Sequence, residues 1–354
     1  MKEYRGIGIM SGTSLDGLDL AYCVFRHKDN NWSYAIEKAE TIAYSPAWKD
    51  RLLYLPETDA ATIQATDIDL GKYIGNAVHE FIERHALSVD FVASHGHTIF
   101  HDPSRKITLQ IGNGERIAAI CKLTVVNDFR SMDVSMGGQG APLVPVGDRL
   151  LFDEFDYCLN LGGIANISYE DQGRRLAFDI CPVNMVLNML AGKLGMPYDD
   201  KGEMAKSGSV VQALLDELES LAFYKLRGPR SLGREWVEEN VFPLIEGDKL
   251  RDIPDLLATF TEHIALRISA VCSEKENTML ITGGGAFNDH LTDRIKYHFS
   301  GSTHIPGSTI IEYKEAMIFA FLGLLRLEGI NNVLGSVTGS GQDHCAGEII
   351  IPEN

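Results

Sequence analysis

The sequence predicts an α/β fold built from two copies of one domain, and three observations support this. Apolar segments typical of strands alternate with amphipathic helical stripes. A strand, small-residue turn and strand open the chain, and a unit of the same plan recurs at 157–169. The 354 residues suffice for two domains. We expect a cleft between the copies, with both glycine-containing turns facing it.

The opening unit is an apolar run that ends in Ser11-Gly12-Thr13-Ser14, followed by a turn at Asp16-Gly17 and a second apolar run. This pattern predicts a β-hairpin with a polar tip. Because the tip residues are small, their N–H groups and hydroxyls can converge on a phosphate. The carboxylates of Asp16 and Asp19 suit a magnesium ion that accompanies the phosphate. An ordinary hairpin with a polar tip is the alternative.

Composition and motif spacing exclude several other classes. No Gly-x-x-x-x-Gly-Lys-Ser/Thr occurs, so a P-loop is not expected. Gly6, Gly8 and Gly12 have the wrong spacing for a dinucleotide fingerprint, and a strand rather than a helix follows them. With 32 Lys and Arg against 49 Asp and Glu, the net charge of −17 disfavours nucleic acid and anionic membranes as partners.

The six cysteines predict a cytoplasmic protein with reduced thiols, because they are scattered and form no Cys-x-x-Cys pair. The first residues, 1–5, run into a predicted strand without an apolar signal core. No uninterrupted apolar run approaches the length that spans a membrane.

The remaining elements follow from periodicity and from turn residues. Pro182 suits the start of a helix. We expect further strands at 32–44, 90–94, 123–126, 176–180 and 278–282, and helices at 69–87, around 117–119, at 183–194, 209–224 and 254–272, up to 295, and at 312–327.

Two segments carry candidate chemistry in the second half. Asp179 ends a predicted strand, where a carboxylate can take a proton from water or a hydroxyl. It could equally be the N-cap of the helix that follows. Gly283-Gly284-Gly285 joins a strand to a helix. Three residues without Cβ leave room for adenosine against the backbone, and a tight packing turn is the alternative.

Polar residues of the first half allow two interpretations. His95, His97, His101 and Asp102 could bind zinc, and Asp128 and Asp133 would then make a metal hydrolase conceivable. The same histidines suit a polar sugar pocket. Arg130 is either a forked donor that binds a carboxylate or an ordinary surface arginine. Glu315, expected in the first turn of an apolar helix, is a pocket acid or a charge that favours the helix dipole.

The order of these motifs resembles that of the 1,6-anhydro-N-acetylmuramic acid kinases, and more widely the superfamily of sugar kinases, actin and heat-shock chaperone ATPases. The matching segments, between Gly8 and about Gly339, are Ser11–Asp19, Thr108–Gly112, Asp128–Arg130, Gly137–Pro145, Asn160–Ile167 and Thr282–Asn288. The resemblance implies two duplicated ribonuclease H-like (actin-like ATPase) domains with a nucleotide and substrate cleft between them. It implies one domain of 1–128 with 330–354, and a second, 129–329, that carries the adenosine loop and the catalytic aspartate.

The resemblance also implies an activity in cell-wall recycling. Water opens the 1,6-anhydro bridge at C1 while O6 attacks the γ-phosphate of ATP, which gives N-acetylmuramic acid 6-phosphate and ADP. Asp179 is the implied general base, and ATP and Mg²⁺ are the implied cofactors, with Asp16 as a metal ligand and a homodimer as the assembly. The implied ATP-binding residues are Ser11, Gly12, Thr13, Ser14, Leu15, Asp16, Gly17, Leu18, Asp19, Gly162, Gly163, Gly283, Gly284 and Gly285, and the implied sugar-binding residues are His97, Arg130, Asn184 and Glu315.

This chain departs from the family pattern at three places. Ile180-Cys181-Pro182-Val183-Asn184 replaces Thr-Gly-Pro-Gly-Asn, and His97 replaces a Gln. Arg230 and Leu232 replace a Lys and a Thr. These departures bear on the choice of sugar, so a kinase for another sugar is an alternative. An actin-like or chaperone-like ATPase with a protein partner and a zinc hydrolase are two more.

Overall fold

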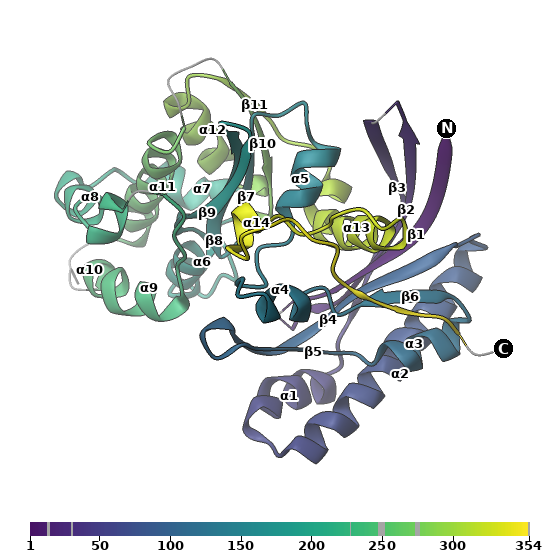
Figure 1. Cartoon of the computed structure of the whole chain (residues 1–354). Coiled ribbons are helices and arrows are strands. Elements are labelled where there is room, and N and C mark those ends of the chain that lie inside the picture. Colours follow the sequence, from purple (N-terminus) through teal and green to yellow (C-terminus); the bar gives the residue numbers. More distant parts are fainter. Residues whose placement is uncertain (13–14, 30, 227, 247–251, 273–276, 353–354) are drawn as a thin grey trace. The chain divides into compact units, whose positions relative to one another are not determined.

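The structure is a computed structural model that describes residues 1–12, 15–29, 31–226, 228–246, 252–272 and 277–352. The chain divides into two compact units (Figure 1). The first unit comprises residues 1–151 and 313–354, and the second comprises 152–312.

The first unit is built on one mixed sheet. Among the described residues the sheet has seven strands in the order β12-β6-β4-β1-β2-β3, with β5 paired to β4. Strands β1, β2 and β3 are antiparallel neighbours, whereas β1, β4 and β6 run parallel. The strands are β1 (Lys2–Ser11), β2 (Gly17–Lys28), β3 (Asn31–Ala43), β4 (Phe91–Asp102), β5 (Ile107–Ile111), β6 (Thr124–Asn127) and β12 (Glu348–Ile350).

Helices cover both faces of this sheet, with α2 and α3 on one face and α13 on the other (Figure 1). Side chains cap their starts: the carboxylate of Asp59 accepts a hydrogen bond from Thr62 N at 2.8 Å, and Asn113 accepts one from Arg116 N at 3.1 Å. The helices are α1 (Pro46–Tyr54), η1 (Leu55–Glu57), α2 (Ala60–His85), η2 (Pro103–Arg105), α3 (Gly114–Cys121), α4 (Ser131–Ser135), α5 (Pro145–Leu151), α13 (Ser308–Leu327) and α14 (Gly335–Thr338).

The alternation Gly6-Ile7-Gly8-Ile9 gives β1 two different faces. The side chains of Ile7 and Ile9 are fully buried in the core that α2 closes. On the opposite face, a Cβ at Gly8 would overlap the carbonyl oxygen of Ala316 in α13. Glycine therefore lets the backbone of α13 lie directly against β1, which brings this helix next to the strand that ends at Ser11.

The second unit repeats the sheet plan of the first. Among the described residues its sheet has five strands in the order β11-β10-β7-β8-β9. Strands β7, β8 and β9 are antiparallel neighbours, and β7, β10 and β11 run parallel. The strands are β7 (Tyr157–Leu161), β8 (Ile164–Asp171), β9 (Arg174–Pro182), β10 (Thr278–Thr282) and β11 (Ser302–His304). An antiparallel triplet extended by parallel strands in both units confirms the predicted α/β fold built from two copies of one sheet plan.

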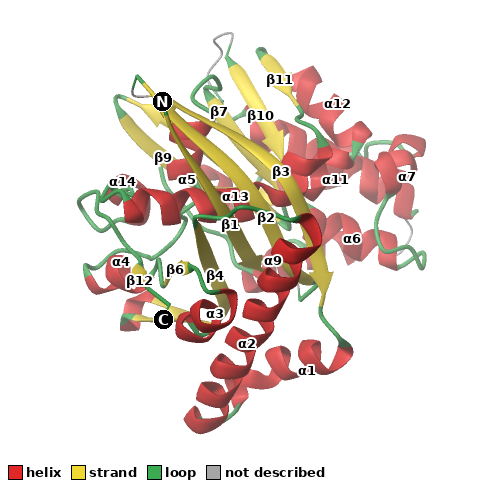
Figure 2. Cartoon of the chain, turned by 90° about the vertical axis from the view of Figure 1, so that its right-hand side faces the viewer, coloured by secondary structure: helices red, strands yellow, loops and turns green. Residues whose placement is uncertain are grey.

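Helices make up most of the remaining second unit. Figure 2 shows α11 and α12 side by side, close to β10 and β11. The fully buried side chains of Leu257, Phe260 and Ile264 on α11 pack in the core of this unit. The helices are α6 (Asn184–Gly192), η3 (Asp200–Gly202), α7 (Glu203–Ser207), α8 (Gln212–Glu219), η4 (Ala222–Lys225), α9 (Arg234–Asn240), α10 (Phe242–Glu246), α11 (Ile253–Ser269), η5 (Gly284–Phe287) and α12 (Asp289–His298).

Several element boundaries differ from the predicted ones. The helix expected at 69–87 begins at Ala60, because the Asp59 cap lies beyond the apolar stripe. The helix expected at 209–224 is divided into α8 and η4. The predicted domain boundaries stay a prediction, and the compact units assign 129–151 and 313–329 to the first unit instead of the second.

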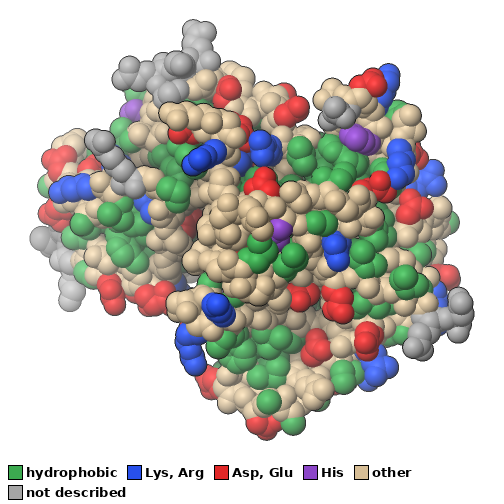
Figure 3. Space-filling model, in the orientation of Figure 1, with side chains coloured by type: hydrophobic (Ala, Val, Ile, Leu, Met, Phe, Trp, Pro, Cys, Tyr) green, Lys and Arg blue, Asp and Glu red, His purple; other side chains and the backbone are tan. Residues whose placement is uncertain are grey.

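Acidic and basic side chains are interspersed over the face shown in Figure 3, which accords with the mixed composition of the sequence. Within the described part of the chain, no helix is both long and apolar enough to cross a bilayer.

Replacement of Gly8 by Ala tests the packing of α13 on β1. The added Cβ would overlap Ala316 O and lie 2.9 Å from Ala320 N, so we expect a loss of unfolding free energy of about 3 kcal/mol. Chemical denaturation measures this loss. Gly192→Ala is the matched control, because its Cβ would meet no atom within 4 Å. Equal stability of both variants would contradict the close approach.

Candidate functional site

The predicted hairpin is confirmed, and its tip lies next to the end of β4. Ser11 is the last residue of β1 and pairs in register with His97 of β4. Its buried Oγ lies 2.8 Å from the hydroxyl of Tyr44 and 3.0 Å from Nδ1 of His97. Burial lowers the pKa of His97, which favours a neutral ring. Thr13 and Ser14 lie outside the described residues, so a phosphate-binding role of the tip stays a prediction.

Arg130 and His95 form a buried pair in the first unit. Nδ1 of His95 donates to the carbonyl of Gly96 at 3.0 Å, which leaves Nε2 as an acceptor. Arg130 donates to this Nε2 from Nε at 3.0 Å and from Nη2 at 2.8 Å, and its Nη1 donates to Gly140 O at 2.6 Å. Burial and the neighbouring guanidinium hold the pKa of His95 well below its ordinary value. The imidazole is therefore neutral and fixes the plane of the guanidinium.

Glu315 lies beside this pair. It is in the middle of α13, which begins at Ser308, so the prediction of a first-turn residue was wrong, and with it the interpretation as a dipole charge. The residue is exposed by surface area, yet dehydration by the surrounding protein raises its pKa. Lys314 and Arg130 lower the pKa, and Asp19 raises it. Burial lowers the pKa of Arg130 to about 10, against the influence of Glu315, so the guanidinium stays charged at neutral pH. His95, Arg130, Glu315 and Asp19, which are far apart in the sequence, thus lie near one another in the first unit.

The histidines do not form a metal site. Both ring nitrogens of His95 are used by Gly96 and Arg130, and Nδ1 of His101 lies 3.1 Å from Thr108 Oγ1. Within the described ranges no group of three His, Cys, Asp or Glu residues has the geometry to hold a metal ion. Asp133 is fully buried, where its carboxylate accepts from Gly140 N at 2.7 Å and from Thr338 Oγ1 at 2.6 Å. Its role is therefore to hold the glycine-rich connection in place.

Asp179 lies inside β9, so it is not an N-cap. Leu232 N donates to Oδ2 at 2.8 Å, and Ser231 Oγ donates to the same oxygen at 3.2 Å. Within the part of the chain that the structure describes, no hydrogen bond reaches Oδ1. Burial raises the pKa of Asp179, while Leu232 N and Ser231 Oγ oppose this rise. A carboxylate with one oxygen held and the other free can accept a proton.

The two glycine turns of the second unit meet at Asn184. This residue begins α6, where its N–H donates to Gly162 O at 3.2 Å and its Nδ2 donates to Leu161 O at 3.1 Å. Gly163 O accepts from the N–H groups of Val183 and Met185. Hydrogen bonds thus hold the turn at Gly162-Gly163 against the start of α6, the helix that follows β9 and its residue Asp179.

The three consecutive glycines serve different purposes. Gly283 has a φ of +79°, and a Cβ there would lie 2.5 Å from Asn160 Oδ1. A Cβ at Gly285 would lie 2.7 Å from Leu161 Cβ, whereas a Cβ at Gly284 would have 3.7 Å to Asn184 Nδ2. The packing interpretation therefore holds for Gly283 and Gly285, and Gly284 faces a cavity.

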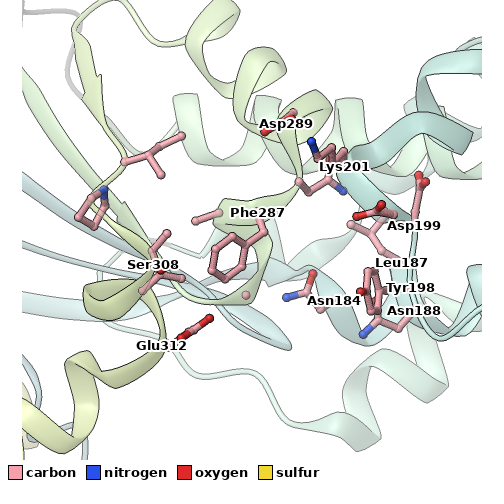
Figure 4. A pocket seen from close by; sticks show the side chains of 17 residues that line it. Asn184, Leu187, Asn188, Tyr198, Asp199, Lys201, Phe287, Asp289, Ser308 and Glu312 are labelled. Atoms are coloured by element: carbon pink, nitrogen blue, oxygen red, sulfur yellow. The ribbon is translucent and has the colours of Figure 1, made fainter. Parts of the chain in front are cut away.

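This cavity of about 800 Å³ lies entirely within the second unit (Figure 4). Its volume is in the range of small-molecule sites. Phe287 and Asn184 reach into it, and Tyr198 and Lys201 lie beside them. The side chains of Phe287 and Tyr198 are 45% and 55% exposed, which is high for aromatic residues. Flat faces open to solvent next to a bare backbone at Gly284 can hold a flat ring.

Sequence reasoning missed most of the lining of this cavity. Tyr198, Asp199 and Lys201 come from a turn with no recognisable motif, and Ser308 and Glu312 come from the start of α13. Asp199 places this turn by accepting from Met204 N and Ala205 N at the start of α7. A helix N-terminus preceded by an aspartate was the one signal that could have indicated the turn.

A second cavity, of about 660 Å³, lies within the first unit. Gln110, Gly112 and Asp128 of the motifs noted in the sequence line it. Asp67 of α2 accepts from Gly112 N at 2.8 Å and from Asn113 Nδ2 at 3.1 Å, which fixes this wall. The motif at 108–112 therefore forms part of the wall of this cavity.

Two carboxylates near the hairpin tip fit the demands of a magnesium ion. Asp16 is exposed in the turn, and Asp19 lies on β2 with its Oδ1 accepting from Thr41 Oγ1 at 2.6 Å. Mg²⁺ is commonly bound by one or two carboxylates together with substrate phosphates and water. The donor set of this loop therefore suits the ion.

Comparison with known proteins gives one family. A family model described as anhydro-N-acetylmuramic acid kinase matches residues 4–352. The chain is 32% identical over 375 residues to the anhydro-N-acetylmuramic acid kinase of Acinetobacter baylyi, covering 97% of this chain and 98% of that protein. It is 33% identical over 378 residues to that of Coxiella burnetii, covering 99% and 98%.

Solved structures resemble the chain more distantly. Component A of (R)-2-hydroxyglutaryl-CoA dehydratase from Acidaminococcus fermentans has a TM-score of 0.45 at 14% identity, over 90% of this chain and 96% of that one. A ROK family glucokinase from Streptomyces griseus, in complex with glucose and AMPPNP, has a TM-score of 0.40 at 11% identity, over 90% and 98%. The fold assignment rests on the repeated sheet plan and on the family match.

The glycine turn gives a paired prediction. Gly285→Ala should lower the unfolding free energy by about 1–3 kcal/mol, because its Cβ would press on Leu161. Gly284→Ala should leave stability within about 0.5 kcal/mol of the unchanged protein, since its Cβ would make only an ordinary contact. Thermal unfolding measures both. A stable Gly285→Ala variant would contradict the packing described here.

Proposed function

Because the chain belongs to the anhydro-N-acetylmuramic acid kinase family, we propose that it opens the 1,6-anhydro bridge of 1,6-anhydro-N-acetylmuramic acid and phosphorylates O6 with ATP. The products are N-acetylmuramic acid 6-phosphate and ADP. The observation that carries this proposal is the family match over residues 4–352, nearly the whole chain. The ATP-dependent kinase activity belongs to the family, and the residue roles below are our assignment.

Asp179 acts as the general base. It removes a proton from a water molecule, whose oxygen forms the new bond to C1 of the sugar. The C1–O6 bond breaks, O6 attacks the γ-phosphorus, and ADP leaves. The geometry that supports this role is a carboxylate held through Oδ2 alone, with a pKa raised by burial. A raised pKa makes a carboxylate a stronger base at neutral pH.

The cavity at Gly284 accepts the adenosine of ATP. Phe287 and Tyr198 offer flat faces for the adenine ring. Gly284 has no Cβ, so its main chain is accessible from the cavity. Ser11, Gly12 and the rest of the tip up to Asp19 hold the phosphates. Asp16 would hold a Mg²⁺ ion, which would supply charge neutralisation for the transferring phosphoryl group.

His97, Arg130, Asn184 and Glu315 position the sugar. Arg130 is charged and is held by His95 through Nε and Nη2, so a carboxylate of the substrate is the group that best matches its remaining N–H donors. We further propose a homodimer in the cytoplasm. The free thiols of all six cysteines support the reducing compartment.

An assay with defined sugars tests the function. Purified protein with ATP and Mg²⁺ should release ADP in the presence of 1,6-anhydro-N-acetylmuramic acid, with equal amounts of the 6-phosphate by mass spectrometry. Free N-acetylmuramic acid, N-acetylglucosamine and glucose serve as comparison substrates. Turnover of a free sugar without turnover of the anhydro sugar would instead establish the alternative kinase.

Replacement of Asp179 by Asn tests the base. We expect kcat to fall by about a hundredfold or more with little change in ATP affinity, because the amide cannot take the proton. In the unchanged enzyme, kcat/KM should fall as the pH drops and the Asp179 carboxylate is protonated. Since burial raises this pKa, the fall should begin above the ordinary range of aspartate. Full activity of Asp179→Asn would remove the residue from the mechanism.

A further inference from the structure

The carboxylate of Asp179 is held by a short segment that belongs to no helix or strand. Asp179 N donates to Arg230 O at 3.0 Å, so residue 230 pairs with β9 through its main chain. Two residues later, Leu232 N donates to Oδ2 at 2.8 Å. Between them, Ser231 Oγ donates to Oδ2 at 3.2 Å.

Arg230 fixes this segment from the other side. Its Nε donates to the carbonyl oxygen of Asp179 at 3.2 Å, and its Nη1 donates to Leu226 O at 2.8 Å. The guanidinium carbon lies 5.6 Å from the ring centre of Phe178 and 4.9 Å from that of Phe223. One side chain therefore ties the segment to β9 and to η4 at once.

A buried polar network anchors η4 in turn. Tyr224 lies next to Phe223, and its hydroxyl is 2.9 Å from Nε2 of the fully buried His263 on α11. Nδ1 of His263 is 2.5 Å from Glu219 Oε1, and Arg267 forms an ion pair with the same carboxylate. The segment that holds Asp179 thus contacts η4 through Arg230, and η4 is held by His263 of α11. Ser231 itself is exposed.

From this arrangement we propose that Ser231 is a positioning residue, whose hydroxyl, together with the Leu232 N–H, holds Oδ2 so that Oδ1 is presented to the reacting water. This inference rests on the proposed role of Asp179 as the general base. Two donors on one oxygen restrict rotation of the carboxyl group and favour its ionised form. The hydroxyl is the part of this pair that a substitution can remove, since the other donor belongs to the main chain.

The two departures from the family pattern are compatible with this role. Leu232 stands where the family has a threonine, but the donor at this position is the backbone N–H, which any residue except proline supplies. Arg230 stands where the resemblance leads us to expect a lysine, and its Nε and Nη1 donate to two different carbonyl oxygens, those of Asp179 and Leu226. Between these two positions, Ser231 is the residue whose side chain donates to the Asp179 carboxylate.

Ser231→Ala tests the inference through the pH profile of kcat/KM for the anhydro sugar. Without the hydroxyl, the pKa of Asp179 should rise further, so the acidic fall of activity should move to higher pH. We expect kcat at neutral pH to decrease about three- to tenfold, in line with one hydrogen bond to a charged group. Ser231→Thr keeps the hydroxyl and should restore the profile. The charged group in contact with Asp179, Arg230, is unchanged in both variants.

Ser207→Ala is the matched control, because this exposed serine also makes one bond, to Met204 O at 2.7 Å, away from Asp179. It should leave the profile unchanged. An unshifted acidic limb in Ser231→Ala, with or without a higher KM, would overturn the positioning role. If Asp179→Asn were fully active, the proposed base would fail instead. Circular dichroism of the exposed Ser231→Ala variant verifies that it is folded.

Discussion

The parallel pairing of two central strands in each unit is the constraint on which the candidate site depends. β1 pairs with β4 in the first unit, and β7 pairs with β10 in the second. Because parallel strands end at the same edge of a sheet, whatever follows them is brought together there. Ser11 consequently meets His97 at the end of β1 and β4, and Gly283 meets Asn160 where β10 and β7 end. Residues far apart in sequence become neighbours without any long-range recognition beyond backbone hydrogen bonds.

The sequence was sufficient for the features that depend on local pattern. The hairpin at the start, the repeated unit at 157–169 and the strand before the three glycines all follow from apolar alternation and from turn residues. The lining of the cavity could not be predicted in the same way. Tyr198 and Lys201 line it together with residues from η5 and the start of α13, and this meeting of distant segments depends on tertiary packing that no local pattern records. The position of Glu315 was wrong because α13 begins four residues earlier than its apolar stripe.

Charged and polar groups that looked alike in the sequence have separate roles in the structure. The carboxylate of Asp133 accepts hydrogen bonds from the N–H of Gly140 and the hydroxyl of Thr338, and it thereby holds the glycine-rich connection in place. Asp179 is also dehydrated, but its two hydrogen bonds go to a single oxygen. His95 resembles a metal ligand in sequence, yet it accepts from a guanidinium, which no metal-bound nitrogen could do. Each carboxylate accepts two hydrogen bonds, so the two differ in how these bonds are distributed over the carboxylate oxygens, which spacing in the sequence cannot reveal.

The residues after Asp179 that depart from the expected pattern lie in the core of the second unit and not on its surface. Ile180, Cys181 and Val183 have no exposed surface, and all three pack in the core of the second unit. These three side chains therefore fill apolar volume beneath the strand. Asn184 is the residue of this run that lines the cavity. A change in sugar preference through these positions would have to act by shifting β9 or α6, since their side chains present nothing to a ligand. His97, in contrast, forms a hydrogen bond with Ser11 at the end of β1, so of the positions singled out in the sequence it is the one in direct contact with the predicted phosphate-binding hairpin.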